Sequence, residues 1–112
     1  MRLTPTNAME ALAAESAEPF LKLFTHGTLE VEIYRLDEVD LQAPHSRDEL
    51  YVVISGTGDF INGDRRHRFE PGEVLFVPAG VDHRFVDFTP DFATWVFFYG
   101  PEGGECGSSG VE

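Results

Sequence analysis

The chain has 112 residues, of which 42% are hydrophobic, so it can form one core and is too short for two. Its formal net charge of −12 argues against nucleic acid and anionic membrane surfaces as partners, because phosphate groups would be repelled. The single cysteine, Cys106, excludes an intrachain disulfide, and no apolar run resembles a signal peptide or a membrane span, so we expect a cytoplasmic protein.

The first 19 residues are polar and rich in alanine, and they predict one short helix. Asn7 can cap this helix, and the stretch AMEALAA that follows it contains strong helix formers. Pro19 ends the helical segment. We therefore divide the chain into an N-terminal segment (1–19), a single barrel domain (20–100) and a tail (101–112).

The body of the chain predicts β-strands throughout, because apolar and polar residues alternate with a period of two. In LEVEIYRL, for example, Leu29, Val31 and Ile33 form the apolar side of a half-buried strand. Turn signals such as Asn62-Gly63 and Pro71-Gly72 separate the segments. In chain order the expected strands are PFLKLF, LEVEIYRL, LYVVIS, GDFI, RRHRF, EVLFV, HRFVDF and ATWVFFY. Short strands at even spacing predict an all-β sandwich or barrel.

His45 and Glu49 stand directly ahead of the strand LYVVIS. On one straight strand they would lie roughly 13 Å apart, whereas metal ligand atoms lie about 2.0–2.2 Å from one ion. A tight turn at residues 46–48 would make His45 the last residue of one strand and Glu49 the first of the next. Their Cβ atoms would then be roughly 5 Å apart. The spacing suits a metal-binding pair on a hairpin, and the structural alternative is a turn whose carboxylate pairs with Arg47 or Arg84.

A second stretch, PGEVLFVPAGVDHRF, places His83 at the start of a strand after a turn. Together the two stretches resemble the two motifs of the cupin superfamily, over about residues 40–88. The first motif matches at His45, Glu49 and Gly56, and the second at Gly72, Pro78, Gly80 and His83.

This resemblance implies a double-stranded β-helix, or jelly-roll barrel, with a metal site near its open end. His45, Glu49 and His83 would hold a divalent transition metal, since two histidines and a carboxylate suit Fe, Zn, Mn, Ni or Co. The first family motif normally carries another histidine where this chain has Ala43, so one ligand is missing. If the turn were two residues shorter, His45 would take that position and Arg47 the second, but hairpin geometry favours the alignment without a gap.

Two classes of function follow from the resemblance. The first is a metal-dependent enzyme of dioxygenase, isomerase, cyclase or lyase type that acts on a small organic molecule. The second is a non-catalytic barrel that binds a small molecule for sensing or storage, with a structural metal or none. Because side chains alternate along a strand, Tyr51 and Asp87 should point inward with the ligands. They are the candidate proton donor and base.

We also expect a homodimer. The last strand is apolar on both faces, so that one face should fill the barrel and the other should lie on a second sheet or a subunit partner. The N-terminal strand PFLKLF could pair with the sheet of a neighbouring subunit. The tail PEGGECGSSGVE is rich in glycine and serine, so we expect it to be mobile and its removal to leave thermal stability unchanged.

Overall fold

The computed structural model describes residues 1–37, 40 and 43–111. Within them the chain forms one helix and eight strands, as the sequence predicts. They are α1 Pro5–Glu15, β1 Phe20–His26, β2 Leu29–Tyr34, β3 Asp48–Ser55, β4 Gly58–Asn62, β5 Arg65–Phe69, β6 Val74–Val77, β7 His83–Val86 and β8 Ala93–Tyr99. No helix in this part of the chain is long and apolar enough to cross a membrane.

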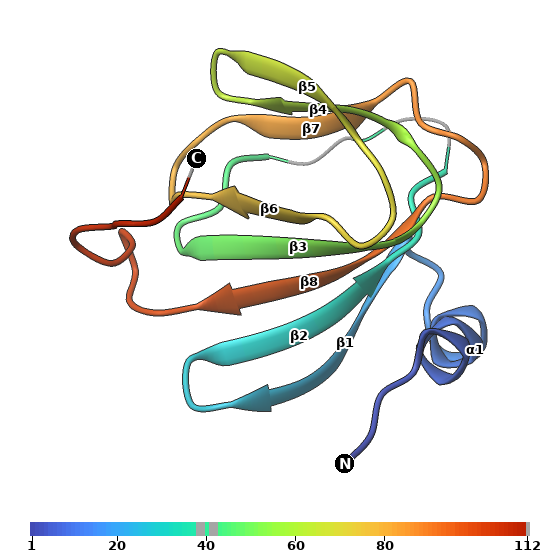
Figure 1. Cartoon of the computed structure of the whole chain (residues 1–112). Coiled ribbons are helices and arrows are strands. Elements are labelled where there is room, and N and C mark those ends of the chain that lie inside the picture. The colour runs from blue at the N-terminus through green and yellow to red at the C-terminus, as the bar shows by residue number, and fades with distance from the viewer. Residues whose placement is uncertain (38–39, 41–42, 112) are drawn as a thin grey trace.

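The strands form two antiparallel sheets that face each other (Figure 1). The larger sheet has the order β1-β2-β8-β3-β6 and the smaller one has the order β5-β4-β7. The last strand, β8, lies in the middle of the larger sheet, between β2 and β3. Two facing antiparallel sheets with long crossovers are the jelly-roll arrangement, so the predicted fold is confirmed.

The N-terminal helix begins before the residue expected to cap it. Thr4 is the N-cap, its hydroxyl accepts a hydrogen bond from the Asn7 backbone N–H at 3.0 Å, and the Asn7 side chain accepts one from the Thr4 N–H at 2.8 Å. Pro5 follows at the first helical position, where its missing N–H has no consequence. Asn7 is therefore not the N-cap but the third residue of the helix, where its side chain completes a capping box with Thr4.

The barrel interior is filled by aromatic and β-branched side chains from both sheets. Tyr51 on β3 and Phe60 and Phe85 on the smaller sheet are fully buried, and the Tyr51 and Phe85 rings meet edge to face with centroids 4.9 Å apart. Each such aromatic pair contributes about 0.5–1.5 kcal/mol beyond the burial of its area. The packed interior holds β3 and β7 in fixed positions relative to each other.

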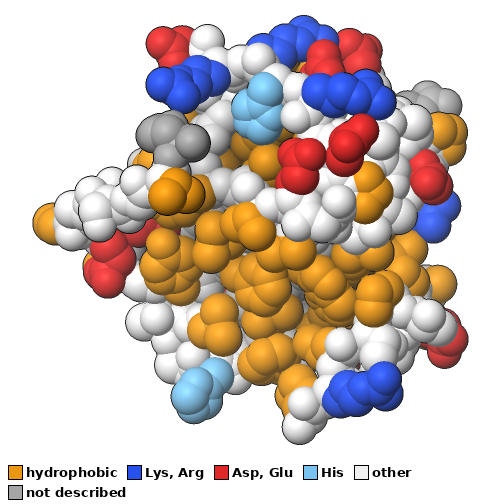
Figure 2. Space-filling view, in the orientation of Figure 1, with side chains coloured by type: hydrophobic (Ala, Val, Ile, Leu, Met, Phe, Trp, Pro, Cys, Tyr) orange, Lys and Arg blue, Asp and Glu red, His pale blue; other side chains and the backbone are white. Residues whose placement is uncertain are grey.

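The outward face of the larger sheet is apolar as well. Ala8 and Leu12 of α1 cover part of it, and the face of β8 that carries Trp95 packs there instead of on a second sheet. At the far edge, Val74 and Phe76 of β6 are 63% and 41% exposed. Figure 2 shows hydrophobic side chains gathered over the larger sheet, whereas charged ones gather over the smaller sheet.

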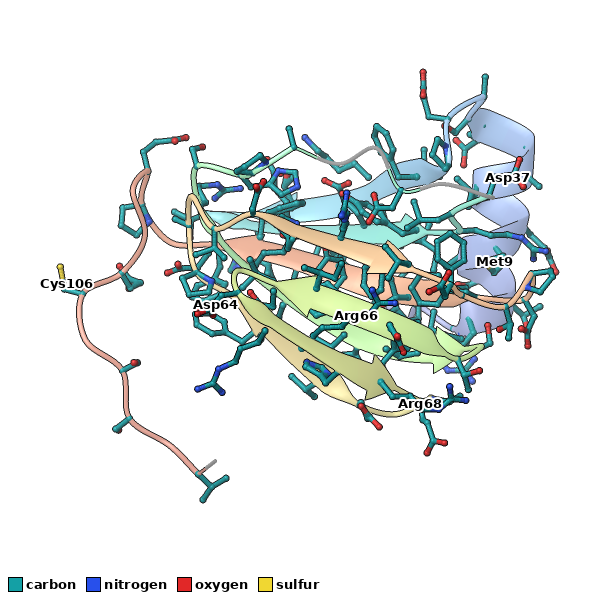
Figure 3. All side chains as sticks on the ribbon, turned by 90° about the horizontal axis from the view of Figure 1, so that it is seen from above. Met9, Asp37, Asp64, Arg66, Arg68 and Cys106 are labelled. Atoms are coloured by element: carbon teal, nitrogen blue, oxygen red, sulfur yellow. The ribbon has the colours of Figure 1, made fainter. Side chains whose placement is uncertain are left out.

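The first residues of the tail are tied to the start of β3. The buried Asp48 carboxylate accepts hydrogen bonds from the backbone N–H groups of Ala79 (3.0 Å) and Glu105 (2.8 Å). The Gly103 N–H donates to the Ser46 carbonyl at 2.7 Å. The mobility expected of the whole tail therefore does not extend to these residues. Beyond them the chain runs away from the barrel, as the position of Cys106 in Figure 3 shows, and mobility there stays a prediction.

Truncation after Gly100 should lower the melting temperature, whereas truncation after Cys106 should leave it unchanged. The first truncation removes the Glu105 N–H from the Asp48 carboxylate, and a hydrogen bond to a charged group contributes about 1.5–3 kcal/mol. For a chain of this length that corresponds to a loss of about 5 °C or more in a thermal unfolding scan. Equal melting temperatures for the two truncated proteins would contradict the contacts described above.

Candidate metal centre

Three side chains with metal-binding atoms meet at one end of the barrel. Glu49 points inward from β3 of the larger sheet, His83 opens β7 of the smaller sheet, and His45 comes from the loop before β3. The Gly80 N–H donates to the His45 carbonyl at 2.7 Å, which joins the loop carrying His45 to the turn before His83. The three residues that the sequence analysis expects to hold a metal therefore lie together, between the two sheets.

The distances in this cluster suit a single ion. His83 Nε2 lies 3.0 Å from Glu49 Oε1, and His45 Nε2 lies 3.9 Å from Glu49 Oε2. One ligand atom from each of the three residues lies within 4.8 Å of the others. Two atoms that are each about 2.1 Å from one ion are about 3.0 Å apart at a right angle and about 4.2 Å apart in line. The two histidine–Glu49 pairs fall in this range but involve different carboxylate oxygens, and the three-atom set extends to 4.8 Å, so the side chains would have to close slightly around an ion.

The atoms that face one another in the cluster are buried and lack hydrogen-bond partners among the described residues. They are His45 Nε2, Glu49 Oε1, Glu49 Oε2 and His83 Nε2. Nε2 of His83 approaches Oε1 of Glu49 to 3.0 Å, and this contact raises the pKa of His83. A carboxylate that is 0% exposed and unsatisfied costs several kcal/mol. A bound divalent cation would offset this cost, so the residues present fit a metal.

The orientation of His83 is fixed by the backbone. Its Nδ1 lies 2.9 Å from the Val81 carbonyl oxygen. A carbonyl oxygen can only accept, so Nδ1 carries a hydrogen, and in the neutral ring the lone pair is on Nε2, which faces Glu49. This is the tautomer that metal-binding histidines have when their other nitrogen donates to a carbonyl.

The cluster shifts the pKa values of the two histidines in opposite directions. Burial lowers the pKa of His45, and the Glu49 carboxylate opposes this only in part. Burial also lowers the pKa of His83, but Glu49 and the Val81 carbonyl outweigh it, so the net pKa of His83 is raised. The cluster therefore favours the protonated form of His83 and the neutral form of His45. A metal ion would compete with a proton for Nε2 of His83.

Tyr51 points inward as predicted, but it lies in the core behind the ligands. It is 0% exposed, and its ring centroid is 6.1 Å from that of His83 and 4.9 Å from that of Phe85. Burial, and then the nearby Glu49 carboxylate, raises the pKa of the Tyr51 hydroxyl well above its ordinary value. The described residues that line the adjoining pocket do not include Tyr51.

Asp87 does not point inward, so the expectation for this residue was wrong. Its side chain is 78% exposed, and Oδ2 lies 2.8 Å from Nη2 of Arg66, which Figure 3 labels on the smaller sheet. The strand β7 ends at Val86, and Asp87 has a φ of 51°. The alternation of side chains stops where the strand stops, so a count from His83 fails at this position.

His45 lies in a loop and not at the end of a strand, which corrects the predicted hairpin. Residues 43–45 are not in a strand, the chain bends at residues 46–47, and β3 begins at Asp48. Pro44 gives a physical reason, because it has no backbone N–H to donate to a neighbouring strand. The bend alone brings His45 back over Glu49.

A pocket of about 610 Å³ opens beside the cluster, which is enough space for a small organic molecule. Its lining residues are Glu18, Pro19, Phe20, Glu30, Glu32, Tyr34, Leu36, Asp40, His45, Ser46, Arg47 and Phe98. The strand β2 contributes three of them by turning its polar side inward. The sequence did not indicate these carboxylates, because alternation predicts one buried side for β2, whereas both of its sides are buried.

A family model described as a cupin domain matches residues 27–99, which is well over half of the chain. This protein belongs to the cupin family. An uncharacterized protein of Streptomyces coelicolor is 33% identical to this cupin over 104 residues, covering 91% of this chain and 99% of the relative.

Solved structures also resemble this cupin. A cupin 2 conserved barrel domain protein from Salinispora arenicola has a TM-score of 0.67 at 16% identity and covers 89% of each chain. The EutQ protein of Clostridium difficile has a TM-score of 0.61 at 26% identity and covers 75% of this chain and 67% of its own. The first of these likenesses shows the fold alone.

Position 43 contributes no metal-binding atom to the cluster. Ala43, where the resemblance to the first cupin motif implies a further histidine, is exposed in the loop before β3 and offers no ligand atom. The cluster of the described residues therefore has two histidines and one carboxylate. Three protein ligands leave more of the coordination sphere open than four would.

Asp87→Asn should leave both the fold and the metal centre unchanged. Asparagine tolerates the left-handed backbone, and the exposed ion pair with Arg66 contributes less than about 1 kcal/mol. Thermal unfolding and the metal content after loading with Co(II) should both match the wild-type protein. Loss of metal at a wild-type melting temperature would place Asp87 in the site.

Proposed function

We propose that this cupin is a metal-dependent enzyme that acts on a small organic molecule. The observation that supports it most is the group of buried, unsatisfied ligand atoms of His45, Glu49 and His83 at the edge of an open pocket. These three residues would hold a divalent transition metal such as Fe, Zn, Mn, Ni or Co. Once bound, the metal would act as a Lewis acid on an oxygen of the substrate.

The chain itself would orient the substrate and supply the proton chemistry. Phe98, which contacts the His45 ring at a centroid distance of 4.7 Å, forms an apolar wall next to the ligands. Tyr34 presents a hydroxyl group to the same pocket. Isomerase, cyclase and lyase chemistry require a proton donor or acceptor near the reacting atoms. Tyr51 would act as a positioning residue behind Glu49.

The second candidate function is a barrel that binds a small molecule without turnover. The contact of His83 with Glu49 supports it, because an imidazolium there would pair with the carboxylate in the absence of metal. A cupin fold by itself does not distinguish the two functions.

We also infer the classes of partner from charge and cysteine use. The net charge of −12 disfavours nucleic acid and anionic membranes, which leaves a small molecule as the ligand. The lone exposed Cys106 is compatible with a cytoplasmic location.

Metal analysis of the purified, untagged protein tests the proposed centre. Elemental mass spectrometry should find about one equivalent of transition metal, and His83→Ala should lose it because two protein ligands hold an ion far less tightly than three. His67→Ala, which removes an exposed histidine of β5, is the matched control and should keep the metal. The proposal fails if the wild-type protein binds none after incubation with Fe(II), Zn(II), Mn(II), Ni(II) and Co(II).

We further propose that the chain forms a homodimer through the outward face of the larger sheet. That face is apolar from α1 to the exposed edge strand β6, and contiguous apolar surface of this kind is typical of protein interfaces (Figure 2). The strand β1 pairs with β2 of the same chain, so the dimer does not require strand exchange between subunits.

Light scattering should give the mass of a dimer for the wild-type protein. The double variant Val74→Glu/Phe76→Glu should be monomeric, because the interface would have to bury two carboxylates. Arg68→Glu on the smaller sheet is the control for a change of charge and should remain dimeric. A monomeric wild-type protein at micromolar concentration would rule the dimer out.

A further inference from the structure

The pocket beside the metal centre is strongly acidic. Arg47 is the one Lys or Arg among the described residues that line it, against four carboxylates from Glu18, Glu30, Glu32 and Asp40. The side chain of Glu30 lies 3.4 Å from both Lys22 and Arg47, so its charge is compensated. Asp40 accepts a hydrogen bond from the Phe85 N–H at 2.8 Å. Glu18 is exposed to solvent.

Glu32 differs from the other three carboxylates. It is only 7% exposed, it lines the pocket, and within the described residues it has no hydrogen bond or ion pair. Its cross-strand neighbours are Val96, which is fully buried, and Lys22, whose ammonium group pairs with Glu30 at 3.4 Å and opposes the rise in the pKa of Glu32 only in part. Burial, followed by the Glu30 carboxylate, raises the pKa of Glu32, which shows that the surroundings disfavour a further negative charge. A ligand that carries a positive charge or a hydrogen-bond donor can supply the partner that a buried carboxylate of this kind lacks.

Aromatic rings lie on the same pocket wall. Phe20 and Tyr34 have ring centroids 5.8 Å apart at an interplanar angle of 50°, and both line the pocket. Aromatic faces attract cations, most strongly where water is excluded. A carboxylate beside two aromatic rings has the chemistry that binds an ammonium group.

We propose that the pocket binds a small organic cation with its ammonium group at Glu32. This inference rests on the proposed function, because the end of the ligand opposite its ammonium group would reach the metal centre. The register supports the placement, since Glu32 pairs with Val96 and Val96 pairs with Tyr51, two residues beyond Glu49. Neighbouring strands lie about 4.8 Å apart, so the backbones of β2 and β3 are about 10 Å apart. A short carbon chain would span the gap between the two side chains.

Titration of the metal-loaded protein with simple cations tests the inference. The probes are butylammonium and choline in an amine-free buffer at neutral pH, set against butanol and the neutral carbon isostere of choline. Each cation should bind at least about tenfold more tightly than its neutral partner, as expected for a hydrogen bond or ion pair with a buried charge. Chemical-shift titration by NMR gives both affinities.

Two variants assign the effect to one carboxylate. Glu32→Gln should weaken cation binding about tenfold and leave binding of the neutral probes unchanged. It should also raise the melting temperature of the ligand-free protein, because it removes an unpaired buried charge. Glu10→Gln, at an exposed position of α1, makes the same change of charge and should alter neither quantity.

The inference is overturned if neither cation binds at millimolar concentration, if cation and neutral isostere bind equally, or if Glu32→Gln leaves cation affinity unchanged. Metal content measured on the same samples shows whether the cation inference or the proposed metal centre has failed. Bound metal without a preference for cations would overturn the inference and leave the metal centre standing. A preference for cations without bound metal would overturn the metal centre and support the pocket.

Discussion

The carboxylate of Glu49 is buried between the two sheets against the imidazoles of His45 and His83, and the candidate site depends on how these groups are held. The register of β3 places Glu49 inward, ahead of Tyr51, whose ring belongs to the packed core. His83 is held by the Val81 carbonyl so that its Nε2 meets the carboxylate. His45 is held from the other side through Gly80. The result is a preformed set of ligand atoms, because none of the three side chains has to change its backbone support to bind an ion.

Glu49 and Glu32 are both buried carboxylates, and together they give the pocket two distinct ends. The first faces two imidazoles, which suits a transition metal, and the second faces aromatic rings, which suits an organic cation. Burying a carboxylate costs free energy unless a partner compensates it, and such a cost is typical of binding sites, where stability is given up for function.

Much of the fold and all three candidate ligands could be predicted, because strand periodicity and motif spacing are local properties of the sequence. The predictions that were wrong depended on where strands end and on how they pack against other elements. The left-handed backbone of Asp87 ends the alternation of β7, and Pro44 keeps the chain before His45 out of a strand. Glu32 was missed because alternation predicts one buried side, whereas β2 is buried on both: α1 covers Ile33 on one side, and Glu32 lines the pocket on the other.

X-ray absorption spectroscopy of the Zn(II)-loaded protein tests the central claim most directly, because it reports the atoms bonded to the metal. The account predicts two imidazole nitrogens and carboxylate oxygen at bond lengths of about 2.0–2.2 Å, completed by water or another exchangeable ligand. The imidazole contribution should fall by half in His45→Ala. A fully aquated ion, or a first shell that is the same in His45→Ala, would show that His83 and Glu49 form an ion pair in place of a metal centre.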